Sequence, residues 1–184
     1  GPLKRHHRAS IVAQHAGGKT LPPEILEHIL VKSDGIPLYV EELTKAMLES
    51  GLVSEESERF VLTGPMRSMA VPSTLHDSLL ARLDRLSVVK EVAQAGAAIG
   101  REFAHATLAA VLSLDPVELN HSLARLTDAG LIHSRGLPPD AVYSFKHALI
   151  QDAAYTTMLR PRRQRLHARI AQVLQADAEL AQRS

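Results

Sequence analysis

Residues Tyr143–Tyr155 read Tyr-Ser-Phe-Lys-His-Ala-Leu-Ile-Gln-Asp-Ala-Ala-Tyr, and this stretch decides the fold because its hydrophobic period changes in the middle. Tyr143 and Phe145 alternate with polar neighbours, which predicts a strand with one buried face. From His147 onward the apolar residues recur at helical spacing. We therefore expect a strand that leads directly into a helix, with His147 at the junction.

His147 has two interpretations at this position. The start of a helix presents unpaired backbone N–H groups and the positive end of the helix dipole, an arrangement that suits an anion. Alternatively, His147 merely caps the helix or fills a gap. The stretch by itself does not decide between the two.

The residues before this stretch predict a winged helix. Asp115 suits a helix N-cap, Pro116 suits the first helical position and Gly130 suits the stop. Helices are expected over residues 73–86, 88–99, 104–112 and 116–129, and short strands over 131–135 and 141–145. Helices followed by a two-stranded hairpin are typical of a winged helix.

The N-terminal part of the chain predicts a smaller helical unit. Helices are expected over residues 7–16, 23–33 and 37–50, followed by a hairpin over 52–62. A linker is expected around Met66 and Pro72. Glu41 and Glu42 are neighbours on one of these helices and point roughly 100° apart, which favours a solvated face over a shared site.

The predicted fold class is therefore mainly α, in four parts. A helical subdomain is expected over residues 3–51, a hairpin and linker over 52–71, a winged-helix domain over 72–158, and the first helix of a C-terminal helical region over 159–184. Pro161 opens this last helix. Since the chain offers it no further helix, we expect its apolar stripe to stay exposed or to pack on residues outside this sequence.

Composition limits the classes of function. The 184 residues carry 21 Lys and Arg against 20 Asp and Glu, a net charge of +1 that argues against a dedicated nucleic-acid or membrane-surface protein. Cysteine is absent, which excludes disulfides and thiolate metal sites and fits a reducing, cytoplasmic setting. No apolar run approaches the roughly 18 residues that span a bilayer.

No self-sufficient active site is visible in the sequence. The ten histidines form no His-Glu-x-x-His motif, and no Ser, His and Asp match a nucleophile motif. Gly18-Lys19-Thr20 resembles the end of a phosphate-binding loop, but Ala13 stands where that loop requires glycine. We therefore expect no catalytic residue, no metal site and no cofactor for this chain by itself.

A winged helix also suggests DNA binding, which is the alternative function. The helix that would enter the groove offers one arginine against one aspartate among its outward residues, which are Asn120, His121, Ala124, Arg125, Thr127 and Asp128. DNA readers normally bring several Lys or Arg to phosphates, so this interpretation is the weaker one. A basic cluster lies elsewhere and suits either phosphate or nucleic-acid contacts or a solvated helix face. It consists of Arg160, Arg162, Arg163, Arg165 and Arg169.

Four motifs, in order, carry a resemblance to a known family. They are Asp34-Gly-Ile-Pro-Leu-Tyr-Val-Glu-Glu-Leu43, Ala81-Arg-Leu-Asp-Arg-Leu86, Ala98-Ile-Gly-Arg-Glu-Phe103, and Phe145-Lys-His-Ala-Leu149 with Ala153-Ala-Tyr155. With them, residues 21–174 resemble the lid and winged-helix region of the signal-transduction ATPases with numerous domains, the AAA-like and NB-ARC-like STAND class. The most similar subgroup is bacterial and places this ATPase between a class III adenylate/guanylate cyclase domain and tetratricopeptide repeats.

The resemblance implies two nucleotide contacts. In such ATPases the Gly-x-Pro turn of the helical lid packs near the adenine, and Pro37 holds that position. The histidine that enters the helix after the winged-helix hairpin reaches the β-phosphate of ADP, and His147 holds that one. The Walker A and Walker B segments, which bind phosphates and magnesium, are absent from this sequence. ATP or ADP with Mg is therefore expected only in a longer parent protein.

The resemblance also implies the function. We expect a non-catalytic nucleotide-sensing and relay module that closes over ADP or ATP bound by an upstream ATPase core. Its partners would be intramolecular: that core, the tetratricopeptide repeats, and a cyclase or other output domain that it regulates. A winged-helix DNA-binding transcriptional regulator is the alternative. No membrane partner is expected, and nucleic acid is disfavoured.

Overall fold

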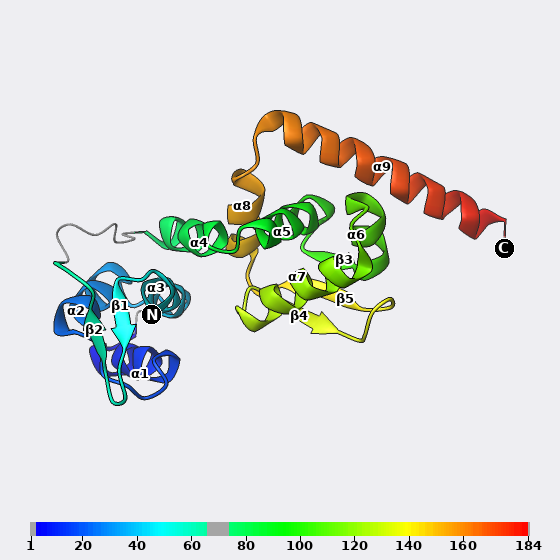
Figure 1. Cartoon of the computed structure of the whole chain (residues 1–184). Coiled ribbons are helices and arrows are strands. Elements are labelled where there is room, and N and C mark those ends of the chain that lie inside the picture. The colour runs from blue at the N-terminus through cyan, green and yellow to red at the C-terminus, as the bar shows by residue number, and fades with distance from the viewer. Residues whose placement is uncertain (1–2, 66–73, 184) are drawn as a thin grey trace. The chain divides into compact units, whose positions relative to one another are not determined.

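The computed structural model describes residues 3–65 and 74–183, which form two compact units (Figure 1). The first unit ends at Arg85 and the second begins at Leu86. The described residues are mainly helical, with two small antiparallel sheets and a C-terminal helix, which confirms the predicted fold class. The linker predicted around Met66 and Pro72 lies outside the described residues.

The described part of the first unit consists of helices and one hairpin, which we give in chain order. They are α1 (Arg5–His15), α2 (Pro23–Lys32), α3 (Pro37–Glu49), β1 (Val53–Glu55), β2 (Phe60–Leu62) and α4 (Leu75–Asp84). Prolines open α2 and α3 because the fixed φ of proline suits the first helical turn. The hairpin forms as predicted, with β1 antiparallel to β2.

Apolar side chains of α2 and α3 lie at the centre of the first unit. Ile25 and Ile29 of α2 share one core cluster with Val40 and Leu43 of α3, and all four are fully buried. The three- and four-residue spacing places them on single helix faces. Each large aliphatic side chain contributes about 1.5–3 kcal/mol when buried. The turn between α2 and α3, which carries Pro37, is therefore anchored on both sides.

Helix α4 belongs to the first unit, whereas the sequence placed it at the start of the winged-helix domain. Its N-cap is Thr74, whose hydroxyl accepts a hydrogen bond of 3.0 Å from the backbone N–H of Asp77. The helix packs on α3, and its buried Arg82 binds side chains there. The division between the units consequently falls after Arg85 and not at residue 72.

The described part of the second unit contains the winged helix and two further helices. Its elements are α5 (Val88–Ile99), β3 (Glu102–Ala104), α6 (His105–Leu112), α7 (Pro116–Asp128), β4 (Ile132–Arg135), β5 (Val142–Phe145), α8 (Ala148–Thr156) and α9 (Arg160–Gln182). Asp115 caps α7 as predicted, since its carboxylate accepts the backbone N–H of Val117 at 2.8 Å.

The sheet of the second unit has three strands in the order β3-β5-β4, all antiparallel. Phe103 of β3 lies opposite Tyr143 of β5, with ring centroids 5.8 Å apart. Helices α5, α6 and α7 with this sheet make a winged helix, and the β4–β5 connection is its wing. The sequence did not predict β3, because three residues are too few to show an alternating pattern.

Helix α9 has a partner over its first half, which corrects the expectation that nothing in the chain would cover it. It packs on α5 and α6. Ile170 and Val173 are buried in one cluster with Val111 of α6. Beyond this cluster the apolar stripe is exposed, with Leu174 and Leu180 at 51% and 64%.

Candidate functional site

The turn between α2 and α3 carries Pro37, the residue expected near an adenine. Asp34 and Gly35 both adopt positive φ, at 48° and 74°, so the chain reverses within a few residues. The N–H of Ile36 donates to the carbonyl of Ser33 at 3.0 Å and closes the turn. Pro37 is exposed and the side chain of Ile36 is half-exposed, so the turn offers a small apolar surface.

Tyr39 lies in the first turn of α3, two residues after Pro37. Its side chain is 7% exposed, and its buried hydroxyl has no hydrogen-bond partner among the described residues. Burial raises the pKa of this phenol, and the charge of Asp77 on α4 raises it further. A buried hydroxyl without a partner costs about 1–3 kcal/mol. Tyr39 is thus an unsatisfied polar group close to the predicted adenine contact.

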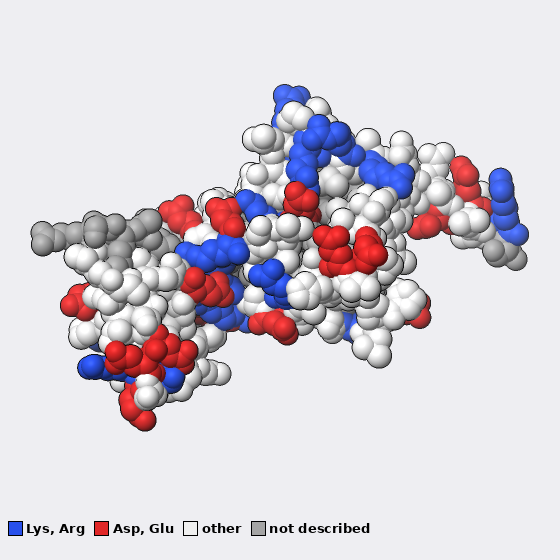
Figure 2. All heavy atoms as spheres, in the orientation of Figure 1, with Lys and Arg blue, Asp and Glu red and all other residues white. Residues whose placement is uncertain are grey.

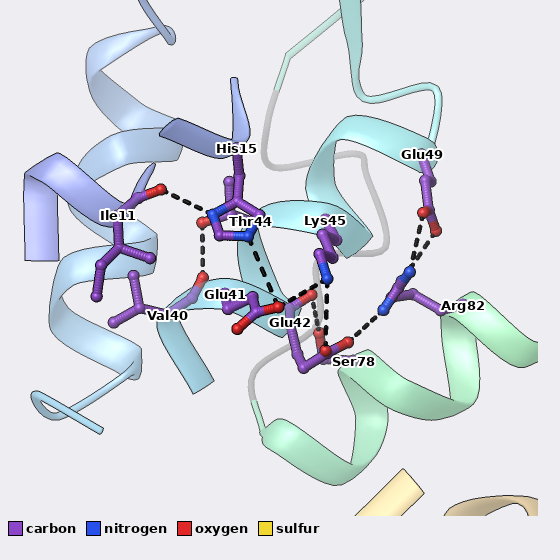
Figure 3. A network of polar contacts seen from close by, with 10 residues as sticks. All are labelled: Ile11, His15, Val40, Glu41, Glu42, Thr44, Lys45, Glu49, Ser78 and Arg82. Atoms are coloured by element: carbon purple, nitrogen blue, oxygen red, sulfur yellow. Dashed lines mark hydrogen bonds and ion pairs between the residues drawn. The ribbon is translucent and has the colours of Figure 1, made fainter. Parts of the chain in front are cut away.

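Figure 3 shows a network of charged side chains that joins α3 to α4. The Glu42 carboxylate is fully buried and binds the guanidinium of Arg82, which is itself 1% exposed. Arg82 also donates to both carboxylate oxygens of Glu49, at 3.1 and 3.2 Å. Burial pushes the pKa of Arg82 down, but Glu42 and Glu49 outweigh it and raise the pKa overall. The solvated face expected for Glu42 is wrong, because α4 covers it.

Glu41 and its neighbour Glu42 have one partner in common, because Lys45 Nζ also lies 3.9 Å from Glu42 Oε1. Lys45 donates to Glu41 Oε1 at 2.8 Å, and the Nε2 atom of His15 on α1 lies 3.7 Å from the same oxygen (Figure 3). The two carboxylates therefore meet only at Lys45 and otherwise contact different helices, as their angular separation on the helix predicts. Together they connect α3 to α1 on one side and to α4 on the other.

The junction of β5 and α8 has the geometry predicted from the sequence. His147 is the N-cap residue of α8, and its backbone carbonyl accepts the N–H of Ile150 at 3.0 Å. Its side chain makes no cap hydrogen bond and is half-buried. The imidazole therefore lies at the positive end of a helix without satisfying that end, which leaves it available to a ligand.

A groove of about 510 Å³ opens along α8 next to this junction. Its lining residues are Ala97, Ala148, Leu149, Gln151, Asp152, Tyr155 and His167. The hydroxyl of Tyr155 and Nε2 of His167 share a hydrogen bond of 2.9 Å between α8 and α9. Because Ala148 and Leu149 directly follow His147, the groove begins beside the predicted anion contact.

The five arginines expected to form one basic patch are divided between different surroundings. Arg162, Arg165 and Arg169 line a cleft of about 330 Å³ between α9 and the helices α5 and α6. Arg163 instead lies over the ring of Tyr155, 5.3 Å from its centroid. Arg160 is exposed at the start of α9.

The face of α7 that would read DNA offers little positive charge. Asn120, one of the predicted outward residues, shares a hydrogen bond of 2.7 Å with the buried His105 and so has a structural role. The groove of about 300 Å³ between α7 and the wing includes Asp128 and is lined by no Lys or Arg. The wing residue Leu137 is 82% exposed. Among the described outward residues of α7 only Arg125 offers a positive charge, whereas DNA-binding helices are normally positioned by several such contacts to phosphates.

The sequence did not predict two polar pairs, the buried Glu42–Arg82 and the partly buried His105–Asn120. The sequence does hint at the burial of Arg82. Ser78 and Arg82 are four residues apart beside the apolar stripe of α4, which places them on one helix face, and both are buried. For His105 and Asn120 no signal exists, since the two residues come from separate helices. Pro37 and His147, the two expected nucleotide contacts, lie in different compact units.

In residues 3–65 and 74–183, no group of three or more His, Asp or Glu side chains is arranged to hold a metal ion. In the same ranges, no helix combines the length and apolarity that crossing a bilayer requires.

Comparison with known proteins finds an uncharacterized relative. No protein-family model matches the chain. Over 152 residues the chain is 29% identical to an uncharacterized protein of Rhizobium meliloti (strain 1021). The match covers 82% of this chain but only 14% of the relative. The chain therefore spans a small part of the length of this relative.

Proposed function

We propose that this chain is a nucleotide-sensing and relay module of a longer signalling ATPase, without turnover of its own. It closes over ADP or ATP held by an upstream core, and it passes the state of that nucleotide to an attached output domain such as a cyclase. The observation that carries the proposal is the geometry at His147. A half-buried imidazole lies at a helix start where its side chain makes no cap hydrogen bond.

This arrangement suits a phosphate oxygen. The backbone N–H groups of Ala148 and Leu149, the first two of α8, have no carbonyl partner within the helix, and the helix dipole adds positive potential there. An imidazole N–H next to them completes an anion site of the kind found at helix starts. The groove that begins at Ala148 gives the rest of a ligand room along α8.

The first unit supplies a second contact and a route for the signal. The exposed turn at Ile36 and Pro37 offers an apolar surface for a nucleobase. Helix α3 starts at this turn and is bound to α4 through Arg82, and α4 leads in the chain to the second unit. Nucleotide exchange at the turn would then be passed through α3 to α4, the helix that precedes the second unit in the chain.

The Rhizobium relative supports a modular role, because its matching region is a small part of a much longer protein. A half-buried imidazole and an exposed turn need further protein to complete a nucleotide site. The chain therefore acts as one part of a multidomain protein in this proposal.

The test is His147→Ala in the longer protein, with the exposed His121→Ala as the control. A hydrogen bond to a charged group is worth roughly 1.5–3 kcal/mol, so ADP affinity should fall about ten- to a hundredfold. Basal output of the attached domain should rise. ADP retained after gel filtration measures the first effect. Equal retention in both variants would contradict the proposal.

DNA binding is the second candidate, and the winged-helix fold is the observation that favours it. The weak charge of the α7 face predicts at most weak, sequence-independent binding that disappears as salt rises. Fluorescence anisotropy with random and selected duplexes at two salt concentrations tests this prediction. Sequence-preferring binding that persists at high salt would favour the transcriptional regulator.

A further inference from the structure

The cleft between α9 and the helices α5 and α6 combines a cationic rim with an apolar floor. It is lined by Glu91, Val111, Leu112, Leu114, Arg162, Arg165, Leu166 and Arg169, and we call it the arginine cleft. All these residues belong to the second unit. The proposed nucleotide contacts use none of them.

The rim consists of three arginines in one row. Arg162, Arg165 and Arg169 are separated by three and four residues, so they follow one face of α9 over about 10 Å. No Asp or Glu occurs on α9 before Asp177, and Glu91 is the one acidic residue among the described residues that line the cleft. Figure 2 shows Lys and Arg side chains gathered along the first half of α9. In a chain whose net charge is only +1, this is a concentrated positive surface.

Two of the three guanidinium groups already have fixed positions. Arg162 lies 4.0 Å from a carboxylate oxygen of Glu91, and Arg169 donates to the carbonyl of Ala110 at 3.1 Å. Arg165 is exposed, and the structure gives it no partner among the described residues. Because a guanidinium carries five N–H donors, all three arginines keep donors for further oxygen acceptors.

The floor favours a protein partner over a nucleic acid. Val111, Leu112, Leu114 and Leu166 contribute apolar surface between the arginines and the rest of the unit. The cleft has no aromatic ring on which a base could stack. The phosphates of a nucleic acid would contact the arginines of the rim and leave the apolar floor exposed to solvent. An amphipathic helix would contact the arginines and also bury the floor.

We propose that the arginine cleft docks an acidic amphipathic helix of another protein segment. Carboxylates at positions i, i+3 and i+7 of that helix pair with Arg162, Arg165 and Arg169. Its leucine-type side chains cover the apolar floor, in the manner of helix-in-groove recognition. Guanidinium–carboxylate pairs are directional, so they set the register as well as the affinity.

The test is fluorescence anisotropy with a labelled synthetic helix of about 18 residues, long enough to fold by itself. The helix carries Glu at the three positions and Leu on the adjoining face, and a second peptide replaces each Glu by Gln. The protein variant is Arg162→Gln/Arg165→Gln/Arg169→Gln. The matched control is Arg101→Gln/Arg125→Gln/Arg183→Gln, which removes the same charge from exposed sites outside the cleft.

The cleft variant should raise the Kd of the Glu peptide at least tenfold, and the control less than twofold. The Gln peptide should bind the unchanged protein at least tenfold more weakly than the Glu peptide. Circular dichroism of both variants checks that they remain folded. Equal losses in the two variants would show attraction to net charge only and overturn the proposal. Tighter binding of a single-stranded RNA than of the Glu peptide would also overturn it.

Discussion

The guanidinium of Arg82 and the carboxylate of Glu42 form an ion pair that is almost completely shielded from solvent. The neighbouring Glu41 is partly exposed and binds Lys45, whose Nζ also lies 3.9 Å from Glu42 Oε1. The buried pair ties α4 to α3, and the hydroxyl of Ser78 adds a hydrogen bond of 3.1 Å to the carbonyl of Glu42. The attachment of α4 to the first unit therefore depends on charge as well as on apolar packing.

Removing Arg82 should destabilise the first unit more than removing both charges. Arg82→Leu leaves the Glu42 carboxylate buried without its partner, which costs about 3–5 kcal/mol. The double substitution Glu42→Leu/Arg82→Leu should cost less than Arg82→Leu, because no buried charge remains. Glu41→Gln, on the partly exposed side, is the control and should cost under about 1 kcal/mol. Urea unfolding followed by circular dichroism compares these three variants and Glu42→Leu with the unchanged protein. If the loss in the double variant equals the sum of the losses in Glu42→Leu and Arg82→Leu, the prediction is contradicted.

Gly96→Ala should destabilise the second unit although alanine is the better helix former. A Cβ atom at Gly96 would lie 2.8 Å from the ring of Phe103, which is 2% exposed and closely packed. Overpacking costs about 1–3 kcal/mol, while the helix propensity of alanine returns up to about 1 kcal/mol. A net loss is therefore expected in thermal unfolding. Phe103→Leu should reduce the extra cost of Gly96→Ala, and a stabilised Gly96→Ala protein would disprove the close contact.

Tyr39→Phe should leave stability at neutral pH unchanged or raise it slightly, because the buried hydroxyl has no partner to lose. Its effect should appear at high pH. Burial raises the pKa of Tyr39 in the folded state above its unfolded value of about 10. Below about pH 10 the phenol is neutral in both states, so the free energy of unfolding keeps its full value there. The contribution of the neutral phenol is lost as pH rises from there toward the folded pKa. Urea titrations at pH about 8 and about 10.5 should show a smaller alkaline loss for Tyr39→Phe than for the unchanged protein.

The fold could be predicted from the sequence where local signals were strong. The pattern predicted α5 with its stop at Gly100, and α7 with its cap at Asp115, because proline, glycine and capping residues act over a few neighbouring positions. The change of period at His147 likewise predicted the β5–α8 junction. Strand β3 is too short to show an alternating pattern, and its pairing with β5 joins residues far apart in the chain, so the sequence does not predict it.

The site was harder to predict because its contacts join distant residues. Glu42 and Arg82 lie on different helices, and a charged residue on an amphipathic helix is ordinarily solvated. The spacing of the α9 arginines in the sequence shows only that Arg162, Arg165 and Arg169 share a helix face. Which arginines line the cleft depends on the face of α9 that α5 and α6 cover. The sequence thus shows which charged and polar residues are present on a helix, whereas the tertiary packing decides which residues they contact.

Asp115→Ala should cost the second unit about 1 kcal/mol, because the carboxylate accepts two backbone N–H groups at the start of α7. Asp115→Asn is the matched control, since asparagine is an equally good N-cap residue and keeps an oxygen in the same place. It should retain most of the stability. Urea unfolding compares the two, and an equal loss in both would show that the charge of Asp115, and not its cap, matters.

His147→Ala should cost the second unit less than about 0.5 kcal/mol, although His147 is an N-cap residue like Asp115. The His147 side chain makes no cap hydrogen bond, so its removal exposes no backbone group that it had satisfied. Asp115→Ala is the internal reference because it removes a working cap from the same unit. In parallel urea titrations, the free energy of unfolding of His147→Ala should nearly equal that of the unchanged protein. That of Asp115→Ala should be about 1 kcal/mol lower. If His147→Ala unfolds as early as Asp115→Ala, the imidazole supports the fold directly. Its availability to a phosphate, and with it the proposed nucleotide contact, would then lose its structural basis.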